Sequence, residues 1–292
     1  MLKAAIDIGT NTSHLIIASI SKGKIEHILY RKRYYTYIAH DGIGCISPSA
    51  EGRLLEAIKN FKYQITQYKV TQVKAVGTEA LRQAENGAEI LNKIADRYSI
   101  DVEIISGNRE AELIHAGASM AISMYNNNYL IVDIGGGSVE FIYALGGEIE
   151  WLHSLPIGIA RLYKTFHNAE PIRIDMIKAL EDHLQEQCNH IFSRISEDYQ
   201  LIGSAGTFET LVQTDLVSTT HTELDKISFE KIYGELIGQD EKKRAKHPSI
   251  RVERAKYIIV ALLLIKYLFS ATGQEKIIVS KYALKEGLLV AQ

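Results

Sequence analysis

The sequence predicts an α/β protein built from two similar domains. Short, mostly apolar segments joined by polar turns, which are typical of strands, are interleaved with segments of helical periodicity along the whole chain. Residues 131–143 repeat the strand–turn–strand pattern of residues 5–17. Asp133 in the second copy corresponds to Asp7 in the first, and the two are about one domain length apart in sequence. The length of 292 residues suits two domains of ordinary size. The repeat therefore predicts two similar domains that face each other across a central cleft.

The first copy is predicted to contain a small sheet with three helices. Apolar side chains recur at helical spacing at Leu54, Ile58 and Phe61, and Ser49 is the expected N-cap of that helix. Strands are expected at residues 3–8, 13–20, 25–31, 72–77 and 102–105. Helices are expected at residues 49–69, 86–97 and 108–124. This domain is expected to span residues 1–124 and to be completed by the C-terminal helix at 283–292.

The second domain is expected over residues 125–282. Its strands are expected at residues 129–134, 138–144, 148–153, 199–203 and 276–280. Its helices are expected at residues 158–167, 172–195, 206–214, 228–239 and 251–270, before the last helix near 283–290. The most apolar segment, residues 257–269, carries Lys266 and is too short to span a bilayer, which predicts a buried helix.

Composition and charge exclude several classes of partner. The formal net charge of -2 provides no general basic field, so no nucleic-acid partner is expected. Cys45 and Cys188 form neither a metal-ligand spacing nor a disulfide framework, which is typical of a reducing cytoplasm. No signal-peptide pattern precedes the first strand. A cytoplasmic protein with no membrane partner is the expectation.

Each copy of the repeat ends a strand with an aspartate and continues with glycine and small polar residues. Glycine permits a tight turn in which backbone N–H groups approach an anion, and an aspartate at the strand end can hold Mg²⁺ beside a phosphate. For a single copy, the alternative is an ordinary hairpin in which glycine only permits the turn, but two copies favour phosphate binding. The candidate phosphate-binding residues are Gly9, Thr10, Asn11 and Thr12 in the first loop, and Gly135, Gly136, Gly137 and Ser138 in the second.

A third glycine cluster, residues 203–207, follows an apolar pair and precedes a predicted helix. Backbone N–H groups at a helix N-terminus bind anions, so Gly206 is a further phosphate-binding candidate. An ordinary strand-to-helix turn, capped by serine or threonine, is the alternative.

Taken together, these motifs resemble the exopolyphosphatase / guanosine pentaphosphate phosphatase (Ppx/GppA) family. Residues 133–140, DIGGGSVE, match the family's second phosphate loop nearly residue for residue, and residues 77–84, GTEALRQA, are similar to its ATxAxRxA motif. The motifs are specific jointly, because their order and spacing agree over essentially the whole chain. The resemblance is carried by residues 6–12, 77–84, 105–114, 133–140, 155–162, 203–207, 253–255 and 279–289.

The resemblance implies a duplicated ribonuclease H-like fold, the fold of actin, sugar kinases and heat-shock proteins, with two similar domains around a central cleft. Sugar and acetate kinases share the two phosphate loops. They are not expected to share the segment of Arg82 together with the segment of Glu110. This pair therefore favours the phosphatase family over its kinase relatives.

The resemblance also implies roles for five side chains. Glu110 is implied as the general base that activates water, and a carboxylate favoured by the helix macrodipole is the alternative. Arg82 is implied to clamp a phosphate. Asp133 is the first candidate to hold Mg²⁺ or another divalent cation, and Asp7 is the second. Glu140 is expected to assist the metal or the water, with a cross-strand partner in the sheet as the alternative.

The expected function is hydrolysis of the terminal phosphoanhydride of inorganic polyphosphate, of guanosine pentaphosphate, or of both. Two alternatives stay open: a sensor that binds polyphosphate or guanosine tetraphosphate with little turnover, and a small-molecule kinase of the same superfamily. The sensor stays open because His14 stands where family members often carry arginine, and because longer members carry an extra helical domain after this core. Members of the family often form homodimers, so a homodimer is also an expectation.

Overall fold

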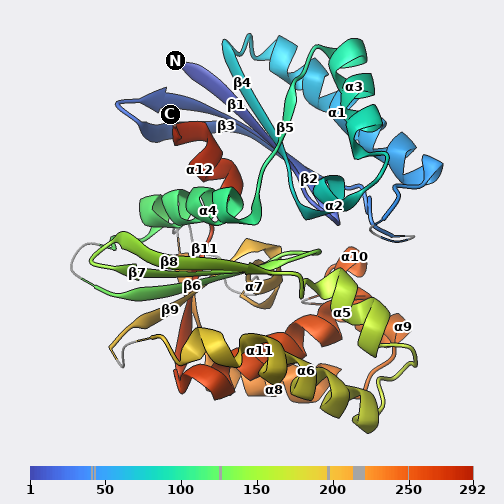
Figure 1. Cartoon of the computed structure of the whole chain (residues 1–292), viewed down its shortest axis with the longest axis vertical. Helices are drawn as coiled ribbons and strands as arrows, with labels where there is room; N and C mark the ends of the chain where they lie inside the picture. The colour runs from blue at the N-terminus through green and yellow to red at the C-terminus, as the bar shows by residue number, and fades with distance from the viewer. Residues whose placement is uncertain are drawn as a thin grey trace. The chain divides into compact units, whose positions relative to one another are not determined.

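The computed structural model describes residues 1–40, 42, 44–124, 127–195, 198–212, 221–248 and 250–291, and it contains two compact α/β units (Figure 1). Unit 1 comprises Met1–Met120 and Tyr282–Gln292, and unit 2 comprises Ala121–Lys281. The C-terminal segment therefore belongs to the same unit as the N-terminus, although all of unit 2 separates the two in sequence.

Unit 1 is built on a five-stranded sheet with the order β3-β2-β1-β4-β5. The first three strands are antiparallel neighbours, whereas β4 runs parallel to β1 and β5 runs parallel to β4. The strands are β1 (Leu2–Ile8), β2 (Thr12–Ser21), β3 (Lys24–Tyr35), β4 (Gln72–Gly77) and β5 (Val102–Ile104). The helices of this unit are α1 (Pro48–Gln67), α2 (Glu79–Gln83), α3 (Gly87–Tyr98), α4 (Gly107–Ala121) and α12 (Leu284–Val290).

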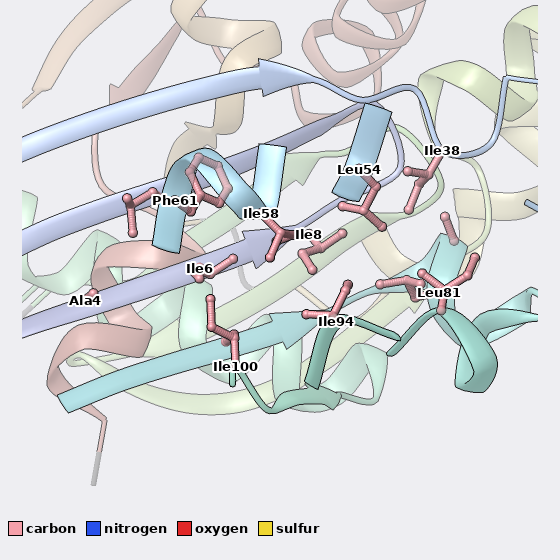
Figure 2. Packing of buried hydrophobic residues seen from close by; sticks show 14 of the residues in the cluster. Ala4, Ile6, Ile8, Ile38, Leu54, Ile58, Phe61, Leu81, Ile94 and Ile100 are labelled. Atoms are coloured by element: carbon pink, nitrogen blue, oxygen red, sulfur yellow. The ribbon is translucent and has the colours of Figure 1, made fainter. Parts of the chain in front are cut away.

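The main core of unit 1 lies between one face of this sheet and helices α1 and α3. Figure 2 shows Ile6 of β1 among Ile58 and Phe61 of α1 and Ile94 of α3, all of them buried. Side chains alternate between the two faces along a strand. Asp7, the neighbour of Ile6, therefore points to the opposite face of the sheet.

The N-cap of helix α1 lies two residues before the serine that the sequence suggests. Ser47, rather than Ser49, is the N-cap, and its Oγ accepts a hydrogen bond from the N–H of Ala50 at 3.4 Å. Pro48 occupies the first turn, where its missing N–H costs no helical hydrogen bond. The hydroxyl of Ser49 instead accepts a hydrogen bond from Arg53 Nη1 at 2.8 Å.

Unit 2 contains a six-stranded sheet with the order β10-β11-β9-β6-β7-β8. Its strands are β6 (Tyr129–Ile134), β7 (Val139–Leu145), β8 (Glu148–Leu155), β9 (Gln200–Ser204), β10 (His221–Asp225) and β11 (Lys276–Ser280). Its helices are α5 (Ile159–Phe166), α6 (Ile174–Phe192), α7 (Ala205–Leu211), α8 (Lys226–Leu236), α9 (Glu241–Arg244), α10 (Val252–Ala255) and α11 (Ile258–Thr272).

The two sheets repeat one topology. The order β8-β7-β6-β9-β11 corresponds to β3-β2-β1-β4-β5, with the same antiparallel hairpins and the same parallel pairs. Strand β10 is an addition at the edge, antiparallel to β11. The predicted α/β class and the internal duplication are confirmed.

The main differences from the predicted elements are the third strand, β3, which continues to Tyr35 rather than ending at residue 31, and several short or interrupted segments. Helices α2 and α9 were not predicted, because four or five residues are too few to reveal a helical period, and strand β10 was not predicted, because its sequence HTELD contains a single apolar residue. The helix expected over residues 251–270 is divided into α10 and α11 by a turn at Lys256 and Tyr257. Of the helix expected over residues 206–214, positions 213 and 214 lie outside the described residues.

Helix α11 is buried along almost its whole length, as its apolar sequence predicts. The side chains from Ile258 to Ile265 are all buried, and the ammonium group of Lys266 forms a salt bridge with Glu181 at 2.9 Å. Across the part of the chain that the structure describes, no helix combines the length and the apolar character needed to cross a bilayer.

The C-terminal helix α12 packs against α4 by direct backbone contact. A Cβ built on Gly287 would lie 1.9 Å from the carbonyl oxygen of Leu113, and one built on Gly117 would lie 2.0 Å from that of Ala283. The buried carboxylate of Glu286 accepts a hydrogen bond from the N–H of Ala283 at 2.9 Å. Glycine at both helix surfaces therefore permits the C-terminal segment to join unit 1.

We predict that Gly287→Ala destabilises the protein by about 1–3 kcal/mol, because the added methyl group overlaps a backbone carbonyl that cannot rotate away. The matched control is Gly52→Ala, a helical glycine of the same unit with open space around its Cβ position. That change is expected to stabilise the protein by about 0.5–1 kcal/mol, since alanine restricts the unfolded chain more than glycine does. Urea denaturation of both variants measures the difference, and equal stabilities would contradict the close helix contact.

Candidate functional site

The first glycine loop connects β1 to β2 in unit 1. The N–H of Gly9 donates to the carbonyl oxygen of Thr12 at 2.9 Å and closes the turn. The N–H of Tyr37 donates to the carbonyl oxygen of Asn11 at 3.0 Å, and the side chain of Thr10 is buried. The four residues predicted to bind phosphate therefore form one short turn that backbone hydrogen bonds hold in place.

Asp7 lies at the end of β1, directly before this loop. The strand register pairs Asp7 with His14 of β2 on one side and with Val76 of β4 on the other. The ring nitrogen Nε2 of His14 lies 2.9 Å from Thr12 Oγ1. His14, which the sequence singles out as a departure from the family, is therefore a direct neighbour of both Asp7 and the loop.

Arg82 and Glu110 belong to two separate sequence motifs, residues 77–84 and 105–114, and the structure brings them together in unit 1. Arg82 Nη1 lies 3.9 Å from Glu110 Oε2, and the carboxylate of Glu110 is buried in the first turn of α4. Arg82 Nη1 also donates to the carbonyl oxygen of Ile105 at 2.5 Å. The guanidinium of Arg82 offsets the charge of Glu110. Because 22% of the Arg82 side chain is exposed, the guanidinium can also contact an external anion.

Glu79 is a member of this cluster to which the sequence analysis gave no role. Its Oε2 accepts a hydrogen bond from Arg82 Nη2 at 2.5 Å, and its side chain is buried. The available signal was its position three residues before Arg82 on the short helix α2, where the two side chains share one face. Glu79 fixes the orientation of the Arg82 guanidinium.

Glu112 lies on the same helix as Glu110 and has a different environment. Glu112 is exposed, and its Oε2 lies 2.7 Å from Arg109 Nη1. Two carboxylates separated by one residue therefore differ in burial and in partner, and only Glu110 contacts Arg82.

The second glycine loop connects β6 to β7 in unit 2 and is fixed by the start of α5. The N–H of Gly135 donates to the carbonyl oxygen of Ser138 at 3.1 Å, as in the first loop. The N–H groups of Gly158 and Ala160 donate to the carbonyl oxygens of Gly137 and Gly136 at 3.2 and 2.8 Å. A Cβ on Gly158 would lie 2.4 Å from the carbonyl carbon of Gly137, so glycine is needed for this contact.

Asp133 and Glu140 flank this loop and are neighbours in the sheet. They are partners in the antiparallel pairing of β6 with β7, and both are buried. Ser154 of β8 donates a hydrogen bond to Glu140 Oε1 at 2.7 Å. The cross-strand arrangement that was the alternative for Glu140 is therefore present, and it places the Glu140 carboxylate beside Asp133.

The third glycine cluster lies between β9 and α7, and its Gly206 contacts an arginine. A Cβ on Gly206 would lie 2.0 Å from Arg254 Nη2, so the guanidinium rests on the glycine backbone. The hydroxyl of Thr207 donates to the carbonyl oxygen of Ile134 at 3.2 Å and ties this turn to β6. Arg254 received no role in the sequence analysis, although it lies within one of the family-like segments.

The oxygen donors of unit 2 fit a divalent cation of the Mg²⁺ type. Mg²⁺ is usually bound by one or two carboxylates together with substrate phosphates rather than by a protein cage. Asp133 and Glu140 provide two adjacent buried carboxylates beside a glycine loop. Among the described residues, no three His, Cys, Asp or Glu side chains converge on one point.

The chain matches one family along most of its length. Residues 16–292 match the Ppx/GppA phosphatase family. The guanosine-5'-triphosphate,3'-diphosphate pyrophosphatase of Aeromonas hydrophila is 26% identical over 296 residues, which cover 99% of this chain. The aligned region is 58% of that relative, so this chain spans little more than half the length of the curated relatives it matches.

Solved structures agree with this match. An exopolyphosphatase from Cytophaga hutchinsonii superimposes with a TM-score of 0.93 at 33% identity, over 98% of this chain and 96% of that one. A PPX-GPPA enzyme from Aquifex aeolicus superimposes with a TM-score of 0.84 at 26% identity, over 100% of this chain and 99% of that one.

We predict that Gly158→Ala weakens phosphate binding by the second loop, because the added methyl group displaces Gly136 and Gly137. Backbone N–H groups bind an anion only when they point at it together, so the affinity for tripolyphosphate in calorimetry should fall well below that of the natural chain. Gly234→Ala on α8 is the control, since its Cβ position is open. Unchanged affinity in a folded Gly158→Ala protein would show that the contact does not set the loop position.

Proposed function

Because the chain belongs to the Ppx/GppA phosphatase family, we propose that it hydrolyses the terminal phosphoanhydride bond of inorganic polyphosphate, of guanosine pentaphosphate, or of both. The observation that carries the proposal is the contact between Arg82 and Glu110, at 3.9 Å. Their two segments together distinguish the phosphatases from the kinases that share the glycine loops. A buried carboxylate beside a partly exposed guanidinium combines a proton acceptor with an anion-binding group.

In the proposed reaction, water attacks the terminal phosphorus and the bridging P–O bond breaks. Glu110 accepts the proton of the attacking water, and the departing phosphate oxygen keeps the electron pair of the broken bond. The products are inorganic phosphate and a chain shorter by one phosphate. Arg82, which Glu79 holds at 2.5 Å, binds a phosphoryl oxygen and offsets the charge that develops on it.

The glycine loops have the supporting role of holding the phosphates. Gly9, Thr10, Asn11 and Thr12 form one phosphate-binding loop, and Gly135, Gly136, Gly137 and Ser138 form the other, with Gly206 as an additional contact. Asp133, with Glu140 beside it, is the proposed holder of a divalent cation. When bound, such a cation polarises phosphoryl oxygens and orients the phosphate chain.

The decisive test is phosphate release from polyphosphate and from guanosine pentaphosphate, with and without Mg²⁺. We predict that Glu110→Gln lowers kcat by about 10²–10⁴-fold, because a general base contributes an effect of that size. Glu112→Gln is the matched control on the same helix, since its carboxylate is exposed and paired with Arg109. The control should retain the activity of the natural protein.

Three outcomes would change the proposal. Full activity in a folded Glu110→Gln variant would remove Glu110 from the role of base. Tight binding of guanosine tetraphosphate or polyphosphate without phosphate release would identify a sensor. Formation of ADP that depends on an added small acceptor would identify a kinase.

A further inference from the structure

Four neighbouring strands of unit 2 carry polar side chains at the same level of the sheet. Ser204 of β9 pairs with Asp133 of β6, which pairs with Glu140 of β7, which pairs with Ser154 of β8. Residues that are partners across a sheet project from the same face, because the pleats of adjacent strands are in phase. The four side chains therefore form one continuous row, which we call the polar row.

The hydroxyl groups at the two ends of the polar row differ in their partners. Ser154 donates to Glu140 Oε1 at 2.7 Å. Ser204 has 0% exposure, and among the described residues nothing forms a hydrogen bond with its Oγ. Buried hydroxyl groups almost always have a partner, because an unsatisfied one destabilises the folded state. This atom lies next to Asp133, on the face where that carboxylate projects.

The backbone that follows Ser204 has a defined conformation. Ala205 adopts φ 69°, a left-handed conformation that is unfavourable for a residue with a Cβ. The Thr207 hydroxyl ties the same turn to the carbonyl oxygen of Ile134, the residue after Asp133. The turn therefore keeps the hydroxyl of Ser204 in register with the Asp133 carboxylate.

The equivalent row in unit 1 has different chemistry. Asp7 corresponds to Asp133, but its neighbours in register are Val76 and His14. Val76 has no oxygen at the position of Ser204, and His14 Nε2 lies against Thr12 Oγ1 at 2.9 Å. Hard cations such as Mg²⁺ prefer oxygen ligands, so the row of unit 2 suits such an ion and the row of unit 1 does not.

We propose that Ser204 supplies a neutral oxygen ligand to a divalent cation bound by Asp133, and that this cation belongs to the polar row of unit 2 rather than to Asp7. The inference rests on the proposed function, because it names the residue that completes the cation site of that reaction. Ser204 is a positioning residue in this scheme, since it acts on the substrate only through the cation.

The test measures Mn²⁺ binding to the whole chain by electron paramagnetic resonance, without substrate. Ser204→Ala should weaken Mn²⁺ binding by about 10-fold, the lower end of the range for residues that support a metal site. Asp133→Asn should abolish binding, and Asp7→Asn should preserve it. The matched control is Thr210→Val, which removes a buried hydroxyl that already donates to the carbonyl oxygen of Gly206 at 2.7 Å. The control should keep the Mn²⁺ affinity of the natural chain.

Two further measurements separate a ligand from a packing role. Without metal, Ser204→Ala should melt at or above the temperature of the natural chain, because the change removes an unsatisfied buried hydroxyl. Ser204→Cys should lose affinity for Mg²⁺ and gain affinity for Cd²⁺, since thiolate ligands select soft metals. A lower melting temperature with unchanged metal affinity would identify a packing role.

The proposal is overturned if Ser204→Ala and Thr210→Val bind Mn²⁺ equally well, if Ser204→Cys leaves the metal preference unchanged, or if the natural chain binds no Mn²⁺. These results are independent of turnover. A chain that releases no phosphate but shows the expected Mn²⁺ affinities refutes the proposed function and keeps the cation site. An active chain whose Ser204→Ala variant keeps its Mn²⁺ affinity refutes only the inference.

Discussion

The hydrogen-bonded register of the first hairpin in each unit decides which side chains meet at the end of the sheet. In unit 1 the register places Asp7 beside His14, and in unit 2 it places Asp133 beside Glu140. A shift of one residue would turn each of these side chains to the opposite face, because the period of a strand is two. Both glycine loops close with the same backbone hydrogen bond, from Gly9 to Thr12 and from Gly135 to Ser138, which fixes that register.

From this shared frame the two units have diverged in chemistry. Opposite the aspartate, the strand after the glycine loop carries the imidazole of His14 in unit 1 and the carboxylate of Glu140 in unit 2. The neighbouring parallel strand carries Val76 in unit 1 and Ser204 in unit 2. Unit 1 instead has the cluster of Glu79, Arg82 and Glu110, in which one guanidinium offsets two buried carboxylates. Buried charges of one sign are tolerated only with such compensation. The duplication therefore supplies one scaffold for two different arrangements of charged side chains.

Much of the fold could be predicted because its signals are local. The continuous apolar run of residues 129–134 and that of α11 specify their own elements, and the repeated Asp–Ile–Gly turns indicate the duplication from residue identity alone. The short elements α2, α9 and β10 could not be predicted, because tertiary packing rather than periodicity stabilises segments of four or five residues. Ser49 suits an N-cap by residue type, but Pro48 occupies the first position of the helix, so the N-cap is the residue before it, Ser47.

By itself the sequence determined the α/β class, the duplication, the two glycine loops and the residue types of the candidate site, because each of these depends on residue identity and spacing along the chain. Only the tertiary structure decided that Arg82 lies between Glu79 and Glu110, that Arg254 rests on Gly206, and that Ser204 joins the row of Asp133 and Glu140. Apart from the pair of Glu79 and Arg82, which share helix α2, these contacts join residues from separate helices and strands. They depend on the order of strands in a sheet and on the close approach of backbones, which no local pattern encodes.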